Sequence, residues 1–182
     1  MTGPSRLVTI VVALAGGYGL FASFVWSVDH MAVQSPLGDT LTVTHVQKAY
    51  ATLNGGLFEG NLSCLELKGS CIPALRRDRP EETFVSHSPG ATPIHQRTRN
   101  RWFVPGERPA TLRSDVSPSS VVSFVYVAVP SGKRPWWMTL APWKRPPYGY
   151  CGDSSGSVCA LTQEWLPPTH VNRCPSTCHA LE

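Results

Sequence analysis

The chain has 182 residues, of which 42% are hydrophobic and 15% are charged, and its formal net charge is +4. This composition excludes a chain that is disordered throughout, and the roughly 150 residues beyond the first apolar stretch are enough for one small domain. The 17 prolines favour loops and short strands over long helices. We therefore expect an α+β protein in which an N-terminal transmembrane helix is followed by a small, disulfide-stapled head with an antiparallel sheet and a short packed helix.

The anchor is expected near the N-terminus. Residues 7–28 carry no charged side chain, and at about 1.5 Å per residue this run spans a hydrocarbon core of about 30 Å. Arg6 precedes the run, whereas the next cation after it is Lys48. The positive-inside rule then places residues 1–6 in the cytoplasm and the C-terminus outside. A cleaved signal peptide is the alternative, with possible cleavage sites at Val25-Trp26-Ser27 and, very early, at Ala13-Leu14-Ala15. The length of the apolar run favours a retained single-pass anchor with membrane lipid as a partner.

Small residues recur along this anchor. Ala15, Gly19 and Ser23 follow one another at four-residue spacing, which puts them on one face of a helix. Small side chains allow two membrane helices to approach closely, so this stripe is a candidate helix-packing site. The alternative is that such residues are simply common in membrane segments.

Residues 29–72 are interpreted as a linker, a short amphipathic helix and a first strand. Pro36 and Gly38 predict that the membrane helix ends within residues 29–39. Thr44 then resembles the N-cap of a new helix, and Gln47 is placed to reach back to that cap.

The new helix presents Val46 and Tyr50 on one apolar face and stops at Gly55-Gly56. Just upstream, the alternation in Leu41-Thr42-Val43 makes a strand the competing prediction. The first strand of the head is predicted from Asn61 to Lys68.

Residues 73–118 are rich in Pro, Arg, Ser and Thr, and we expect them to form a long, partly disordered excursion. Eight arginines lie between Arg76 and Arg113, which suggests a nucleic-acid or anionic-membrane surface. A solvated, arginine-rich loop is the favoured alternative, because no aromatic-interleaved binding fold surrounds these arginines. No nucleic-acid partner is therefore expected.

Residues 119–182 are expected to contain the sheet and the Cys-rich C-terminal part. Val121 to Val129 is apolar on both faces, which predicts a central strand, and Pro130 ends it. Residues 131–150 are interpreted as a loop or edge strand that covers the sheet. Three tryptophans in this segment form a candidate binding patch: Trp136, Trp137 and Trp143.

An even number of cysteines in an exported chain suggests disulfides. The candidates are Cys64, Cys71, Cys151, Cys159, Cys174 and Cys178. Fifteen pairings are possible, and the simplest prediction joins neighbours as Cys64–Cys71, Cys151–Cys159 and Cys174–Cys178. A zinc site of Cys174 and Cys178 with His170 and His179 is the alternative. It lacks the second, separate pair of ligands that zinc sites usually have, so we predict no metal and no cofactor.

The segment Gly152-Asp153-Ser154-Ser155-Gly156 matches the G-x-S-x-G pattern of serine hydrolases. It is also similar to the nucleophile loop of trypsin-like proteases, although no Ala-His-Cys segment upstream supplies a base. Pro146-Pro147 argue against the strand that must precede a nucleophilic Ser154, and His170 and His179 follow too closely to be spread over a hydrolase sheet. We therefore expect a flexible turn rather than an enzyme.

Several segments together resemble bacterial type IV pilin-like and pseudopilin-like proteins. In many of these the helix after the anchor carries a Gln-x-x-Tyr pattern followed by a glycine pair, as do Gln47, Tyr50 and Gly55-Gly56 here. The other similar segments are Val43 and Val46 in the same helix, Cys64-Leu65 with Cys71-Ile72-Pro73, Tyr126–Pro130 as a late strand, and Gly149–Gly156 as a hairpin.

The resemblance implies a structural or assembly protein: a single-pass anchor whose α+β head packs with protein partners outside the cytoplasm, in the bacterial periplasm. The processing signature of the family, a glycine followed by Phe-Thr-Leu-x-Glu, is absent from Pro4–Thr9, and residues 7–28 contain no acid. The resemblance therefore does not extend to peptidase processing or to filament assembly. The alternatives are a tethered or secreted binding module that uses the tryptophan patch and, least favoured, a hydrolase that uses Ser154.

Overall fold

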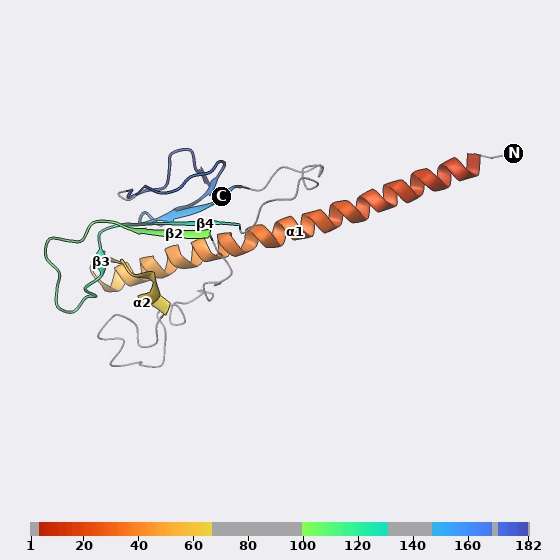
Figure 1. Cartoon of the computed structure of the whole chain (residues 1–182). Coiled ribbons are helices and arrows are strands. Elements are labelled where there is room, and N and C mark those ends of the chain that lie inside the picture. Colours follow the sequence, from red (N-terminus) through yellow and green to blue (C-terminus); the bar gives the residue numbers. More distant parts are fainter. Residues whose placement is uncertain (1–3, 67–99, 131–146, 169–170, 182) are drawn as a thin grey trace.

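The computed structural model describes residues 4–66, 100–130, 147–168 and 171–181. Figure 1 shows one long helix whose C-terminal half lies along one face of a sheet, while the N-terminal half extends away from it. In chain order the elements are α1 (Pro4–Leu53), β1 (Phe58–Glu59), α2 (Leu62–Glu66), β2 (Asn100–Pro105), β3 (Ser120–Val121), β4 (Phe124–Val129), β5 (Gly149–Asp153), β6 (Val158–Leu161) and β7 (His179–Ala180). The α+β class and the antiparallel sheet are as the sequence predicts.

Helix α1 is continuous through Pro36, so the predicted end of the first helix within residues 29–39 is wrong. A proline inside a helix costs about 3 kcal/mol because it removes one backbone hydrogen bond and crowds the preceding turn. Here the next three turns bury one face of the helix completely, including Val43 and Val46. That burial offsets the local cost. Thr44 consequently lies inside α1, and its predicted role as an N-cap is also wrong.

The C-terminus of α1 lies where the sequence places it. Gly55 and Gly56 both adopt positive φ angles, of 65° and 86°, which a residue with a side chain rarely adopts. The Gly56 amide donates to the Ala51 carbonyl at 2.8 Å and so satisfies one of the last acceptors of the helix.

The main sheet has five antiparallel strands in the order β2-β4-β5-β6-β7, and a separate pair joins β1 to β3. The predicted strand Val121–Val129 is confirmed, with a break after Val121 where the chain passes from the small pair into the main sheet. All residues of β4 are buried. Both of its faces are apolar because α1 covers one of them and the C-terminal segment packs on the other.

Three segments differ from the prediction. The described part of the predicted strand Asn61–Lys68 is not a strand: Leu62–Glu66 is helical, and Asn61 caps its first turn by accepting from the Ser63 amide at 3.2 Å. Asn100–Pro105, within the expected excursion, is a strand that pairs along its whole length with β4. Gly149–Asp153 is a strand although prolines precede it. Residues 67–99 and 131–146 lie outside the described parts of the chain.

The two faces of β4 support two separate cores. Its side chains alternate, so that Phe124, Tyr126 and Ala128 pack toward α1 while Val125, Val127 and Val129 pack on the opposite face. The core beside α1 contains Val43, Val46, Tyr50, Ala51, Phe58, Leu65, Val121, Phe124, Tyr126 and Ala128. The opposite core contains Val125, Val127, Val129, Cys151, Cys159 and Leu161, with Trp102, Tyr148, Trp165, Val171, Cys174 and Cys178 packed against it.

Candidate functional site

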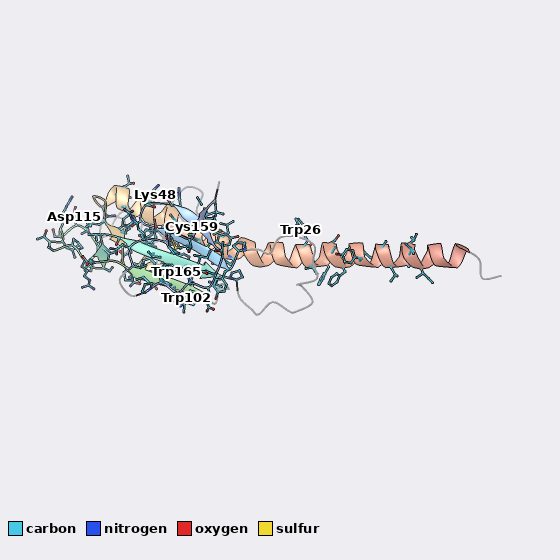
Figure 2. All side chains as sticks on the ribbon, turned by 90° about the horizontal axis from the view of Figure 1, so that it is seen from above. Trp26, Lys48, Trp102, Asp115, Cys159 and Trp165 are labelled. Atoms are coloured by element: carbon cyan, nitrogen blue, oxygen red, sulfur yellow. A yellow bond between two sulfur atoms is a disulfide. The ribbon has the colours of Figure 1, made fainter. Side chains whose placement is uncertain are left out.

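The N-terminal half of α1 exposes a long apolar surface. Ile10–Ser27 is the one helical segment among residues 4–66 and the other described parts that is long and apolar enough to cross a membrane. Leu14 and Leu20 are 68% and 77% exposed, and Figure 2 shows this half of the helix extending clear of the head. Continuous apolar surface of this extent is stable when lipid or another protein covers it.

The predicted small-residue stripe lies on this exposed half. Ala15, Gly19 and Ser23 are all exposed, and a Cβ atom placed on Gly19 would meet nothing within 4 Å. The Ser23 hydroxyl donates to the Gly19 carbonyl at 3.0 Å, so its polarity is satisfied within the helix. The stripe therefore offers a shallow, open surface to a neighbouring helix.

Where α1 meets the sheet, the helix lies directly on the backbone of β5. A Cβ atom on Gly152 would lie 2.2 Å from Thr44 Oγ1 and 3.0 Å from Thr40 Cγ2. Both threonines are buried, and Thr44 Oγ1 has no hydrogen-bond partner among the described residues. Only glycine at position 152 permits this approach of helix to strand.

Gln47 fastens the far end of α1 to β1. Its side chain is fully buried and exchanges two hydrogen bonds with the backbone of Glu59: Gln47 Nε2 donates to the Glu59 carbonyl at 2.8 Å, and the Glu59 amide donates to Gln47 Oε1 at 2.9 Å. The prediction that Gln47 reaches back to a helix cap is wrong, because no cap is present there. The predicted position of Tyr50 on the apolar face is confirmed by its complete burial, and Gln47 is fully buried beside it.

The carboxylate of Glu59 is buried beside this pair. Its Oε1 accepts from the Asn61 amide at 2.9 Å and from the Ser119 hydroxyl, whereas Oε2 has no partner in the described parts of the chain. The Tyr50 hydroxyl lies 3.2 Å from Ser120 Oγ. Burial raises the pKa of Tyr50, and the negative charge of Glu59 raises it further. We call Gln47, Tyr50, Glu59, Ser119 and Ser120 the polar clasp, because they tie α1 to β1 and β3.

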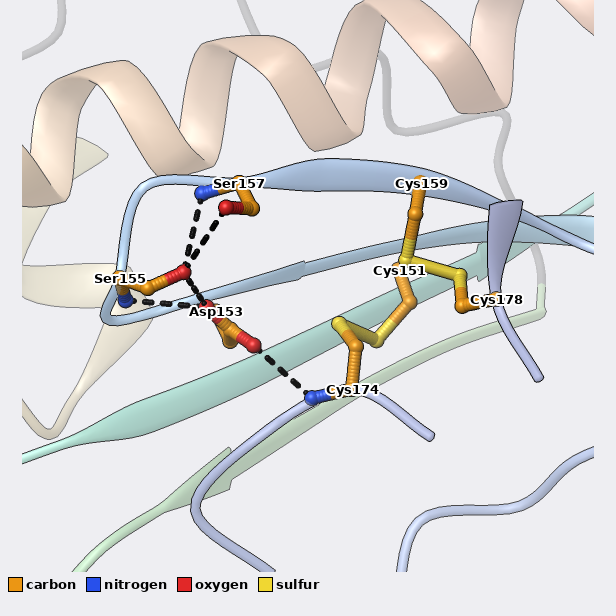
Figure 3. The surroundings of a disulfide bond; sticks show 7 residues. All are labelled: Cys151, Asp153, Ser155, Ser157, Cys159, Cys174 and Cys178. Atoms are coloured by element: carbon orange, nitrogen blue, oxygen red, sulfur yellow. Dashed lines mark hydrogen bonds between the residues drawn. A yellow bond between two sulfur atoms is a disulfide. The ribbon is translucent and has the colours of Figure 1, made fainter. Parts of the chain in front are cut away.

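Four of the cysteines lie on the sheet face opposite α1: Cys151, Cys159, Cys174 and Cys178. The strand register places Trp102, Val127, Cys151 and Cys159 in one row across β2, β4, β5 and β6. The described residues of the C-terminal segment, 162–168 and 171–181, are here called the strap. Trp165, Val171, Cys174 and Cys178 of the strap pack on this face, and Figure 1 shows the blue C-terminal trace on the side of the sheet away from α1. Cys151 bonds to Cys174 and Cys159 bonds to Cys178 (Figure 3).

The predicted local pairs Cys151–Cys159 and Cys174–Cys178 are therefore wrong. The two sheet cysteines stand side by side, and the strap brings a partner over each of them. The native bonds close loops of 23 and 19 residues, and in the chain-entropy account each contributes about 3 kcal/mol. The third predicted pair includes Cys71, which lies outside the described residues; Cys64 is disulfide-bonded.

Asp153 holds the strap beside the disulfides. Its Oδ2 accepts from the Cys174 amide at 2.9 Å, while its Oδ1 accepts from the amide and the hydroxyl of Ser155 (Figure 3). A second polar tie runs from the Ser123 hydroxyl to Asn172 Oδ1 at 3.1 Å. Sequence reasoning assigned Asp153 only to a turn, because a carboxylate that binds a distant amide leaves no local pattern.

The enzymatic and metal alternatives find no support in this geometry. Ser154 does follow a strand, but a turn into β6 follows it instead of a helix, and no hydrogen bond joins it to His179 among the described residues. Cys174 and Cys178 are in disulfides and so cannot bind zinc as thiolates. No cluster of metal-ligating side chains occurs in the part of the chain that the structure describes, which leaves out His170.

Two predicted surfaces lie largely outside the described ranges. Trp136, Trp137 and Trp143 all fall there, as does much of the arginine-rich segment. Of its described members, Arg113 forms an exposed ion pair with Asp115 at 2.5 Å, which lowers the pKa of that carboxyl.

Comparison of the chain with protein-family models, with curated proteins and with solved structures finds no significant match in any of the three.

Proposed function

We propose that this chain is a membrane-anchored structural or assembly subunit, similar in architecture to pilin-like and pseudopilin-like proteins, with its head outside the cytoplasm. The main support for this proposal is that one continuous helix, α1, forms both the apolar segment and part of the head. Its exposed apolar half is the right length for a bilayer, and its other half is the buried spine of the head. Because one helix forms both the anchor and the core of the head, it fixes where the head lies relative to the membrane, as a structural subunit requires.

The continuity of α1 supports a retained anchor over a cleaved signal peptide. A cut after Ser27 would fall in the middle of an unbroken helix, whereas signal peptides end in an accessible segment before the mature fold. The disulfides support an oxidising location for the head, because thiols stay reduced in most cytoplasms.

The proposed partner contact in the membrane is close helix packing along Ala15, Gly19 and Ser23. Residues 7–28 contain no carboxylate that would set the register of a partner by charge. The open, exposed stripe instead favours association by shape. The head then carries the contacts outside the membrane.

Membrane fractionation and protease protection test the location. The full chain should remain in the membrane pellet after alkaline carbonate washing, and its head should be cut by protease added to the outer side of the membrane. Leu20→Arg should release much of the protein, because a central arginine costs about 2.5–3.5 kcal/mol of insertion free energy. Recovery of a soluble, fully reduced chain from the cytoplasm would refute the proposal.

Cysteine cross-linking tests the packing face. Gly19→Cys should give a disulfide-linked dimer in membranes. The matched control, Leu20→Cys, lies one residue further and so about 100° around the same helix. Equal cross-linking of both variants, or of neither, would contradict packing along the stripe while leaving the location untouched.

A further inference from the structure

The two described disulfides interleave. In chain order the four cysteines are Cys151, Cys159, Cys174 and Cys178, and the first bonds to the third while the second bonds to the fourth. An oxidant that acts on cysteines as soon as they meet would join the nearest pairs instead.

The β5–β6 hairpin brings Cys151 and Cys159 together without any help from the strap. They are direct register partners, and opposed residues of antiparallel strands have Cα atoms about 4.5–5.5 Å apart, within the range of about 4.4–6.8 Å that a disulfide spans. The connecting turn is closed locally, because the Gly156 amide donates to the Asp153 carbonyl at 2.9 Å. Hairpins of this length form in about 1–10 μs.

The strap also brings its own two cysteines together. The Cys178 amide donates to the Pro175 carbonyl at 3.0 Å, which closes a turn between Cys174 and Cys178. Closing so short a loop costs little chain entropy. Both neighbour pairs are therefore local events.

The native pairs, in contrast, need the strap to be seated on the sheet. Its polar ties to that face are the bond from the Cys174 amide to Asp153 and the bond between Ser123 and Asn172, which join residues 21 and 49 positions apart. The strand β7 adds the short pairing of His179–Ala180 with β6, and the Leu181 amide donates to the Val158 carbonyl at 3.4 Å. Contacts of this range form after the local hairpin.

We propose that oxidation of this head first joins Cys151 to Cys159 and Cys174 to Cys178, and that a thiol–disulfide isomerase is the partner that accelerates the conversion of these pairs into the native ones. The inference goes beyond the proposed function and rests on it only for the compartment in which such a partner acts. The half-buried strap cysteines offer the accessible sulfur atoms, whereas Cys151 and Cys159 are buried in the folded head.

The conversion balances without an oxidant. A thiolate of the isomerase attacks Cys178 Sγ, breaks the Cys174–Cys178 bond and releases the Cys174 thiolate. That thiolate attacks Cys151 Sγ, forming the native Cys151–Cys174 bond and releasing the Cys159 thiolate. The Cys159 thiolate then attacks Cys178 Sγ in the mixed disulfide, forming Cys159–Cys178 and expelling the isomerase thiolate unchanged.

One tryptic cut distinguishes the neighbour pairing from pairings that join the sheet cysteines to the strap cysteines. Arg173 is exposed and directly precedes Cys174. In the native pairing, cleavage after Arg173 leaves the segment 174–182 attached through disulfides, whereas in the neighbour pairing it is released as a free cyclic peptide. Reduced, denatured full-length chain is diluted into detergent, oxidised with diamide in the absence of thiols, cleaved, and analysed by mass spectrometry without reduction.

The released cyclic peptide should be the main early product, and addition of a bacterial disulfide isomerase should convert it to the attached form several-fold faster than glutathione buffer alone. Attachment from the first time point under thiol-free oxidation would overturn the proposal. A second variant tests the hairpin pair directly: in Cys174→Ser/Cys178→Ser, oxidation should join Cys151 to Cys159, and persistence of both free thiols would also overturn it. Neither outcome bears on where the protein resides.

Discussion

Gly152→Ala tests whether the contact between α1 and β5 limits the fold. The added methyl would lie 2.2 Å from Thr44 Oγ1, where ordinary contacts begin at about 3.4 Å, so α1 or Thr44 must move by about 1 Å. Thr44 is β-branched, and on a helix its side chain has two preferred χ1 rotamers in which to avoid the methyl. Overpacking of this kind costs about 1–3 kcal/mol. The smaller entropy of the unfolded alanine chain offsets only about 0.4–1 kcal/mol of this cost.

Thermal unfolding of the full chain in detergent, followed by circular dichroism, measures the effect. A net loss of about 1–2 kcal/mol should lower the Tm by roughly 2–8 °C in a protein of this size. Thr44→Ala removes the obstructing atom together with a buried hydroxyl that has no described partner, so alone it should change stability little. The double variant should recover most of the loss, which gives a coupling of about 1 kcal/mol or more.

Gly38→Ala is the matched control. It also replaces a glycine by alanine, but in α1 and with nothing within 4 Å of the new methyl. It should stabilise the helix by about 0.5–1 kcal/mol. If Gly152→Ala is as stable as the wild type, or if the two substitutions in the double variant are additive, close contact at this position does not constrain the fold.

Three further outcomes are expected. Gln47→Ala removes both hydrogen bonds to the Glu59 backbone and should cost about 2–4 kcal/mol in denaturant titrations, whereas Thr52→Ala on the exposed face should cost under about 0.5 kcal/mol. Cys159→Ser/Cys178→Ser should lower the unfolding free energy by about 3 kcal/mol, and an unchanged denaturant midpoint would show that this disulfide does not stabilise the head. Burial raises the pKa of Tyr150 above 10. The contribution of the protonated phenol to stability is therefore complete below pH 10 and is lost as pH rises through the folded-state pKa. Tyr150→Phe should flatten the alkaline fall in Tm, and a fall identical to that of the wild type would refute this role of Tyr150.

Local patterns were sufficient for some elements. Gly55 and Gly56 end α1 because glycine adopts positive φ angles readily, whatever elements surround it. The apolar run of β4 predicts a central strand because both of its faces must be covered, wherever the covering elements come from.

Other elements depend on partners that are distant in the sequence. Pro36 predicts a helix end, yet α1 continues because the sheet buries the turns that follow. Asn100–Pro105 is a strand because β4 supplies its hydrogen bonds, although its own arginine- and proline-rich surroundings indicate a loop. The predicted disulfide pairing is wrong for the same reason. Cys151 and Cys159 are adjacent in the sheet, but each bonds to a cysteine of the strap.

The two faces of the sheet in the described head are held by different kinds of interaction. On the face beside α1, burial and the polar clasp join the helix to β1 and β3, and neither described disulfide lies in that core. On the opposite face, two disulfides and two side-chain hydrogen bonds hold the strap. Reduction should therefore loosen the strap while α1 stays seated on the sheet. The face beside α1 would then keep its packing in either redox state, whereas the strap face would loosen when its two disulfides are reduced.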